Sequence, residues 1–191
     1  MSAAIFTAEQ EMARRLHPHR PKLDIAILAL GKLGGRGLDF GSDLDLVISY
    51  FDPAARIADL TPQEFYSRAV ELFTNALSSM TRDGSLYRVD LRLRPYGSKG
   101  MTAVSIDSFL RYITESAAIW ELLAFVKLRF AGGDASIGET LEQEIRHSIH
   151  EKARAIPQGE LRDETRKMRL ALERRTPPRR SGDIDIKFGA G

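Results

Sequence analysis

Two apolar runs in the first third of the chain predict neighbouring β-strands. Residues 23–30 (LDIAILAL) are almost wholly apolar and end at Gly31, which is typical of a central strand buried on both faces. Residues 43–50 alternate instead. One face of that strand carries Leu44, Leu46, Ile48 and Tyr50, and the other carries Asp43, Asp45, Val47 and Ser49. The glycine-rich residues between the two runs, 31–42, predict a loop with room for one helical turn.

A third strand is predicted over residues 86–94, where apolar and charged positions alternate again. The apolar face would carry Tyr87, Val89, Leu91 and Leu93, and the polar face Arg88, Asp90, Arg92 and Arg94. A loop over residues 95–100 follows. This strand therefore places one carboxylate among arginines.

The clearest helix begins after Thr61. Thr61 is an N-cap residue, Pro62 takes the first helical position, and Glu64 completes a capping box. The apolar stripe behind them comprises Phe65, Ala69, Leu72, Phe73, Ala76, Leu77 and Met80. The pattern ends at Asp83-Gly84. Further helices are predicted over residues 7–16, 105–114, 117–130, from Ser136 onward, and 162–175.

Composition narrows the class of protein. The 191 residues are 43% hydrophobic and 28% charged, as in an ordinary soluble globular protein. The absence of cysteine excludes disulfides and thiolate metal sites and fits a reducing cytoplasm. No apolar run approaches the roughly 20 residues that span a bilayer, so no membrane partner is expected. The net charge of +2 gives no reason to expect a nucleic-acid partner.

Candidate chemistry begins with Asp43 and Asp45. On one face of a strand, their Cα atoms would lie roughly 6.5–7 Å apart. Such a pair can bind two divalent ions about 3.5–4 Å apart, and Mg²⁺ is the natural occupant because it prefers oxygen ligands and bridges phosphates. Acidic pairs at strand ends are common, so the pair alone is weak evidence.

Three neighbouring features strengthen this interpretation. The glycine-rich loop leads into the pair, and such loops bind anions through backbone N–H groups. Asp90 could complete the metal site and take a proton from an attacking hydroxyl, although a salt-bridged surface strand would explain it as well. The surrounding cations suit phosphates: Arg88, Arg92, Arg94 and Lys99. The loop does not match a dinucleotide-binding fingerprint, because Phe40 stands where a third glycine is needed. It does not match a Walker loop either, because Ala26 stands where the first glycine is needed and Leu33 stands where Ser or Thr should follow Gly31-Lys32.

The stretches GKLGGRGLDFGSDLDLVISY and RVDLRLRPYGSKG closely resemble the glutamine synthetase adenylyltransferases, members of the polymerase-beta-like nucleotidyltransferase superfamily. The superfamily pattern is a hydrophobic residue, Gly, then Gly or Ser, a spacer, and Asp-hydrophobic-Asp. Leu30-Gly31-Lys32 and Asp43-Leu44-Asp45 take these places, and the departure at Lys32 is typical of this family. The likeness continues through Trp120-Glu121, residues 125–127 and residues 185–189, so it covers most of the chain from residue 23.

The resemblance implies an α+β fold, a mixed sheet with flanking helices followed by the start of a helical domain. The expected division is a helical lead-in over residues 1–22, a catalytic core over 23–105, and a helical segment over 106–191 that is incomplete at its C-terminus. The enzymes of this family carry two such nucleotidyltransferase domains in a much longer chain, so a fragment is expected.

The resemblance also implies an activity and roles for the candidate residues. One domain transfers AMP from ATP to a tyrosine of glutamine synthetase, the other removes it by phosphorolysis, and the PII signalling protein and glutamine select between them. Two Mg²⁺ ions would be held by Asp43, Asp45 and Asp90, which are also the expected catalytic residues. The nucleotide would be held by Gly31, Lys32, Gly34, Ser42, Arg92, Arg94 and Lys99.

Several alternatives stay open at this point. The direction of the reaction cannot be read from residues that both domains share. The acceptor could be RNA or a small molecule, since basic residues gather between Arg162 and Arg180, although a solvated helix face followed by a linker explains these as well. A non-catalytic nucleotide-binding module is a further alternative. The four histidines are expected to be exposed, and Trp120 is expected in the core, with Glu121 and Lys127 as candidate nucleotide or substrate contacts.

Overall fold

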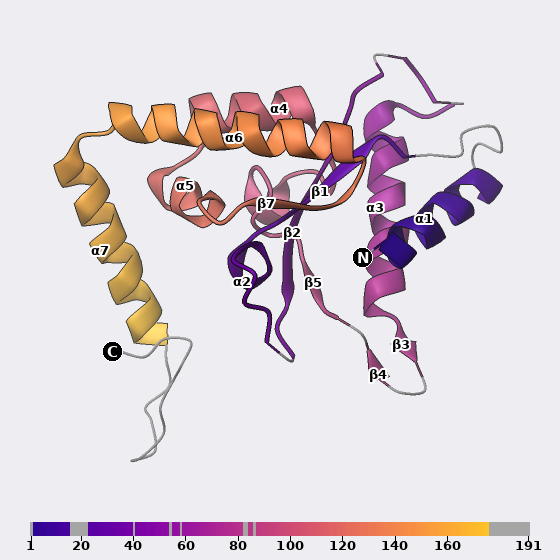
Figure 1. Ribbon diagram of the computed structural model, residues 1–191, viewed down its shortest axis with the longest axis horizontal. Coiled ribbons are helices and arrows are strands. Elements are labelled where there is room, and N and C mark those ends of the chain that lie inside the picture. Colours follow the sequence, from indigo (N-terminus) through magenta and orange to yellow (C-terminus); the bar gives the residue numbers. More distant parts are fainter. Residues whose placement is uncertain are drawn as a thin grey trace.

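The computed structural model describes residues 2–15, 23–39, 41–53, 55–57, 59–81, 84–85 and 87–175. Five described strands form a mixed sheet that is covered by helices on both faces (Figure 1), which confirms the predicted fold class. The strands of this sheet are β1 (Ile25–Ala29), β2 (Leu44–Tyr50), β5 (Val89–Asp90), β6 (Val104–Ser105) and β7 (Arg129–Gly133). A separate hairpin consists of β3 (Met80–Thr81) and β4 (Gly84–Ser85).

Strand β1 lies in the middle of the sheet, as its apolar run predicts. It pairs antiparallel with β2 on one side and with β7 on the other, and all five of its residues are buried. Its side chains alternate between two hydrophobic cores, one on each face. Strand β2 pairs in parallel with both β5 and β6 along its other side, so these two short strands share one edge of the sheet.

One face of the sheet is covered by α1 (Ser2–Arg15) and α3 (Pro62–Ser78). The predicted capping box of α3 is confirmed: the Thr61 hydroxyl accepts from the Glu64 N–H at 3.2 Å, and the Glu64 carboxylate accepts from the Thr61 N–H at 2.8 Å. The buried side of α3 is wider than the predicted stripe, because Tyr66 and Val70 are buried as well. The helix ends at Ser78, before the hairpin, and therefore earlier than predicted.

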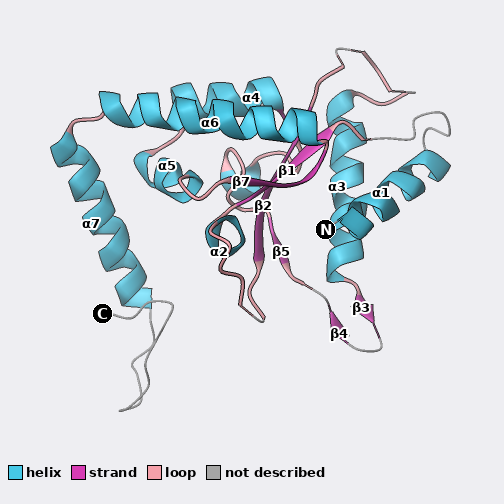
Figure 2. Ribbon diagram, viewed as in Figure 1, coloured by secondary structure: helices cyan, strands magenta, loops and turns pink. Residues whose placement is uncertain are grey.

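The other face is covered by helices from the second half of the chain (Figure 2). These are α4 (Ile106–Arg111), which continues into the π-helical turn η2 (Tyr112–Ser116), then α5 (Ile119–Phe125) and α6 (Ala135–Ala155). Helix α7 (Gln158–Arg175) follows, and each of its residues from 158 to 171 is at least partly exposed, which agrees with a solvated basic face. No helix among the described residues is long and apolar enough to cross a membrane.

Three sequence predictions about this region are wrong. The helix predicted over residues 117–130 ends at Phe125, and its last two residues, Arg129 and Phe130, belong to β7, because the backbone of this segment pairs with the open side of β1. Helix α6 starts after Asp134 rather than Ser136, since the Asp134 carboxylate caps the N–H groups of Ser136 and Ile137. Trp120 is 46% exposed and is not a core residue.

The third predicted strand is also much shorter than expected. Only Val89 and Asp90 pair with β2. The Asp90 carboxylate accepts the backbone N–H of Arg92 at 2.8 Å, which turns the chain out of the sheet. As a result Leu91 and Leu93 pack against opposite cores instead of sharing a face. The predictions for residues 176–191, including the motif at 185–189, lie outside the described residues.

Candidate active site

The sheet register brings two of the predicted carboxylates side by side. Asp45 of β2 and Asp90 of β5 are directly paired residues on adjacent parallel strands. Neighbouring strands lie about 4.8 Å apart, so these two acids are as close as the backbone of a sheet allows. Asp43 comes just before β2, where the N–H of Leu44 donates to the carbonyl of Arg88 at 2.7 Å. All three acids therefore lie where β2 begins beside β5.

Each of the two outer carboxylates has an arginine partner. Nε of Arg88 lies 2.8 Å from Oδ1 of Asp43. Nε of Arg92 donates to both carboxylate oxygens of Asp90, at 3.0 and 2.9 Å. These hydrogen bonds hold the pKa of Asp90 below its ordinary value, against the opposite effect of burial. Asp90 is thus ionised at neutral pH.

Arg92 is influenced by all three acids. Its pKa is raised chiefly by the hydrogen-bonded Asp90, and the charges of Asp43 and Asp45 raise it further. The exposed guanidinium of Arg92 therefore interacts electrostatically with all three carboxylates. Because a guanidinium binds phosphate through the same forked geometry, Arg92 could exchange Asp90 for a phosphate group.

Gly31 provides a close fit to Asp45. Its φ of +52° belongs to the left-handed region, and a Cβ built there would stand 2.2 Å from Oδ2 of Asp45. Only glycine allows this contact between the loop backbone and the carboxylate. The glycine that opens the predicted phosphate loop is therefore tied to one of the predicted metal ligands.

The remaining loop residues are held by local contacts. Gly31–Gly34 form the single-turn helix α2, as predicted for the loop. Lys32 is ion-paired with Asp39, and the backbone N–H of Ser42 donates to the Asp39 carbonyl at 3.1 Å. Gly34 is needed for packing, since a Cβ there would lie 2.1 Å from the carbonyl oxygen of Lys127.

Arg94 and Lys99 lie in the loop that follows β5, and the charge of Arg94 contributes to lowering the pKa of Asp90. Arg94 donates to the carbonyls of its own loop, at 2.6 Å to Leu91 and 3.1 Å to Gly100, and burial lowers its pKa. Its guanidinium thus closes the loop that follows β5. Lys99 is exposed in the 3₁₀ turn η1 (Gly97–Lys99).

The three acids are the candidate ligands for a divalent metal. Among the described residues, no group of three or more His, Asp or Glu side chains is arranged to hold a metal ion. The donor chemistry nevertheless fits Mg²⁺, because the acids supply hard oxygen ligands. Oδ1 of Asp43 is buried and lies 2.8 Å from Nε of Arg88, without a hydrogen bond of good geometry. A metal ion bound to this oxygen would replace the Arg88 guanidinium.

Two features of this region are absent from the sequence predictions. Arg129 of β7 donates to the carbonyls of Leu33 and Gly34, at 3.0 and 3.4 Å, and so caps the C-terminal end of α2. Glu121, a candidate nucleotide or substrate contact, instead accepts the hydroxyl of Tyr112 and the N–H of Ala118. No local spacing signals the contacts of Arg129 or the contact of Glu121 with Tyr112, because these partners are distant in sequence or lie on separate helices. The contact of Glu121 with Ala118 has the three-residue spacing of a helix cap.

Comparisons with known proteins identify the family of the chain. The family model for glutamate-ammonia ligase adenylyltransferase matches residues 1–144. The chain belongs to this family. Among the curated relatives, the bifunctional glutamine synthetase adenylyltransferase/adenylyl-removing enzyme of Bartonella quintana is 37% identical over 99% of this chain. The enzymes of the same name from Aromatoleum aromaticum and Methylococcus capsulatus are 42% and 40% identical over 91% and 87% of the chain.

The adenylyltransferase relatives are much longer than this chain. The match spans 20% of the Bartonella protein, 18% of the Aromatoleum protein and 17% of the Methylococcus protein. The chain thus spans about a fifth of the relatives it matches. Their bifunctional names describe the longer proteins.

Proposed function

We propose that this domain transfers AMP between ATP and a tyrosine of glutamine synthetase, or removes it by phosphorolysis, with Mg²⁺ as the metal. The observation that carries the proposal is the direct pairing of Asp45 with Asp90 beside Gly31. The relatives' names supply the acceptor protein and leave both directions open. The PII regulator, a cytoplasmic location and the division at residues 22 and 105 belong to the same proposal and rest on the family resemblance.

The residues of the chain suit this chemistry. Asp43, Asp45 and Asp90 would hold Mg²⁺, which supplies charge neutralisation for the phosphates when bound. Gly31, Lys32, Gly34 and Ser42 would form the phosphate loop, with Arg92, Arg94 and Lys99 near its open side. In the forward direction a tyrosyl oxygen forms a bond to the α-phosphorus of ATP, and the bond to pyrophosphate breaks. In the reverse direction inorganic phosphate attacks the same phosphorus, which yields ADP and free tyrosine.

Asp90 would accept the tyrosyl proton during the forward step. While Arg92 holds Asp90, the depressed pKa makes this carboxylate a weak base. Movement of the Arg92 guanidinium onto a phosphate would release Asp90 and raise its basicity. The ion pair thus gives a physical reason for the base to become active only when the nucleotide is present.

Label transfer from [α-³²P]ATP to glutamine synthetase tests the proposal. Asp45→Asn should lower transfer and Mg²⁺-dependent ATP binding by roughly 100-fold or more, because the loss of one charged group at a reacting centre has effects of that order. The exposed Asp163 of α7 offers a matched control, since Asp163→Asn should change neither quantity. A phosphorolysis assay on adenylylated glutamine synthetase determines the direction.

Unchanged turnover in Asp45→Asn would contradict the assignment, provided that circular dichroism shows both variants folded. Label on RNA but not on glutamine synthetase would favour another acceptor. Mg²⁺-dependent ATP binding with no transfer in either direction would favour a non-catalytic nucleotide-binding module.

A further inference from the structure

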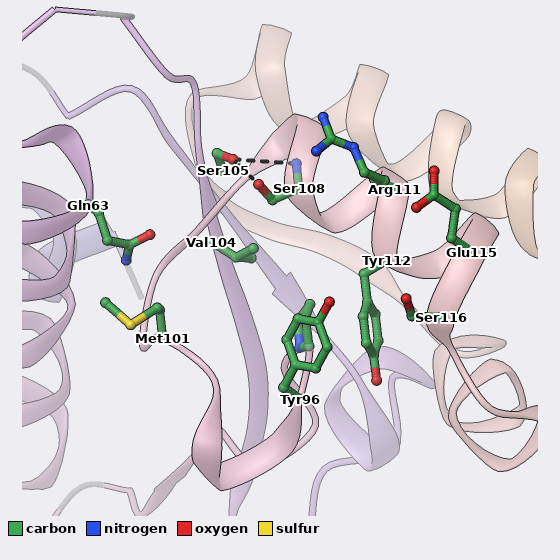
Figure 3. A pocket seen from close by; sticks show the side chains of 11 residues that line it. Gln63, Tyr96, Met101, Val104, Ser105, Ser108, Arg111, Tyr112, Glu115 and Ser116 are labelled. Carbon is green, nitrogen blue, oxygen red and sulfur yellow. Dashed lines mark hydrogen bonds between the residues drawn. The ribbon is translucent and has the colours of Figure 1, made fainter.

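A second hollow opens beside β6, which pairs with the same side of β2 as β5 does. Figure 3 shows the side chains that line this hollow. It encloses about 280 Å³ and lies between α3, the loop after β5, and the α4–η2 helix. Its walls include Gln63 of α3, Val104 and Ser105 of β6, and Tyr96 and Met101 of the loop. We call it the edge pocket.

The edge pocket and the candidate active site lie beside two strands, β6 and β5, that pair with the same side of β2. Asp45 pairs with Asp90 of β5, and four residues further Ser49 pairs with Val104 of β6. Four residues of a strand span about 13 Å, so the acids and the pocket lie at that separation on one edge. Arg92 lines the depression at the acids, and Pro95, three residues later, lines the edge pocket.

Most polar groups in the pocket wall are already satisfied. Gln63 donates to the carbonyl of Ala103 at 2.7 Å and accepts the Tyr50 hydroxyl at 3.2 Å. The Ser105 hydroxyl bonds to Ser108 at the start of α4. Polar and apolar residues therefore share the pocket lining. Beside the engaged polar groups, Tyr96, Met101 and Val104 supply the apolar surface that a buried side chain would contact.

The rim of the pocket has the composition of a protein-binding surface. Tyr96 is 66% exposed and Met101 is 56% exposed, although both are large hydrophobic residues. Tyr96 packs edge-on against Tyr112 at a centroid distance of 4.8 Å, and its φ of +62° fixes its place in the loop. The carbonyl of Arg111 accepts the Thr114 hydroxyl at 3.0 Å, whereas its guanidinium has no hydrogen-bond or ion-pair partner among the described residues. Tyrosine, methionine and arginine are the residue types enriched at protein interfaces.

The volume argues against a whole nucleotide. Pockets that hold drug-sized ligands measure about 300–1,000 Å³, and the edge pocket lies just below that range. Arg111 is also the only Lys or Arg among the lining residues, which is too little charge for a triphosphate. One or two side chains of a peptide match the space and the charge better.

We infer that the edge pocket docks an extended loop of the acceptor protein, and this inference rests on the proposed function. One apolar side chain of that loop enters the pocket against Tyr96 and Met101, and Arg111 donates to a backbone carbonyl or carboxylate beside it. The modified tyrosine lies about four residues away, since an extended chain advances about 3.3 Å per residue and reaches the acids over that distance. The pocket thus selects the acceptor, and the acids perform the transfer.

Direct binding of glutamine synthetase to the 191-residue chain tests the inference, with Mg²⁺-dependent ATP binding measured separately. Met101→Asp and Arg111→Glu each place a mismatched charge at the pocket rim. Val126→Asp and Arg166→Glu are matched controls on α5's end and on α7, since Val126 is 58% exposed and Arg166 is exposed. Circular dichroism checks that all four variants fold.

The expected result is at least tenfold weaker binding of glutamine synthetase by both pocket variants, with ATP binding within twofold of wild type and both controls unchanged. Weakened ATP binding in the pocket variants would overturn the inference, because it would make the pocket a nucleotide subsite. Unaltered binding of glutamine synthetase would overturn it too, as would a wild-type chain that binds ATP but not glutamine synthetase. If wild type binds glutamine synthetase through the pocket but fails to bind ATP, the proposed function fails and the docking site stands.

Discussion

The candidate active site joins two regions that hold their acids in different ways. On the β2 side, Asp45 lies in a seven-residue strand that is paired on both sides, and the backbone of Gly31 packs against its carboxylate. On the β5 side, Asp90 lies in a strand of only two residues and is held by Arg92. The first acid is positioned by backbone and the second by a side-chain ion pair. We therefore expect the β2 half of the site to be rigid and the β5 half to rearrange when a ligand binds.

The most damaging change to the rigid half should be Gly31→Ala. The added Cβ meets the Asp45 carboxylate at 2.2 Å, and the backbone there has a positive φ. Strain of about 3 kcal/mol at such a position corresponds to a roughly 100-fold loss of Mg²⁺-dependent ATP binding if it falls on the bound state. Isothermal titration of ATP measures the effect. Gly37→Ala is the control, because no atom lies within 4 Å of a Cβ there; equal affinities in the two variants would contradict a backbone-built site.

A smaller effect is expected from Gly34→Ala, which tests the packing beneath the same loop. Its Cβ would stand 2.1 Å from the Lys127 carbonyl and 2.8 Å from the Ala29 carbonyl, and backbone atoms cannot move aside as a flexible side chain can. We expect a loss of about 2–3 kcal/mol in the free energy of unfolding, typical of overpacking. Urea denaturation of this variant beside Gly37→Ala measures it. A midpoint equal to that of wild type would show that the loop tolerates movement against β1.

The smallest effect should come from the adjustable half, through Arg92→Gln. Arg92 depresses the pKa of Asp90, so the stabilisation is present above the unfolded-state pKa of aspartate and is lost as pH falls through the lower folded-state value. Because Arg92 is exposed, solvent screens the ion pair and the effect on stability should be small. Urea midpoints at pH 7 should differ between the variant and wild type, and this difference should shrink at pH 3. A difference that persists unchanged at pH 3 would show that the ion pair is not its source.

The sequence predicts the rigid half better than the adjustable half for a physical reason. The alternation in residues 43–50 and the apolar run before it determine β2 and β1 locally, so the shared face of Asp43 and Asp45 follows from strand geometry. Alternation in residues 86–94 is just as regular, yet the strand stops at Asp90 because that side chain bonds the next turn of the backbone. A hydrogen bond from side chain to backbone leaves no trace in hydrophobic periodicity.

The sequence alone also does not predict which distant segments pair in the sheet. Residues 117–130 have enough apolar positions for a helix, and only the unpaired side of β1 makes residues 129–133 a strand. Likewise the partnership of Asp45 with Asp90 depends on which strand lies beside β2, which no single segment encodes. The residues of the candidate site could be selected from the sequence. The pairing of Asp45 with Asp90, on which the proposed function rests, follows from the register of β2 and β5, and only the fold supplies that register.

The hydrogen bonds from Arg129 to the carbonyls of Leu33 and Gly34 have a consequence for the order in which the chain folds. The Arg129 guanidinium comes from a residue 96 and 95 positions later in the sequence than the two carbonyls it holds. During synthesis the acids and the glycine loop emerge long before the strand that secures them, and contacts of such high sequence separation form late. We therefore expect the Gly31–Gly34 turn to reach its final shape only after β7 has joined the sheet. If the proposed function holds, completion of the sheet determines when the domain can first bind a nucleotide.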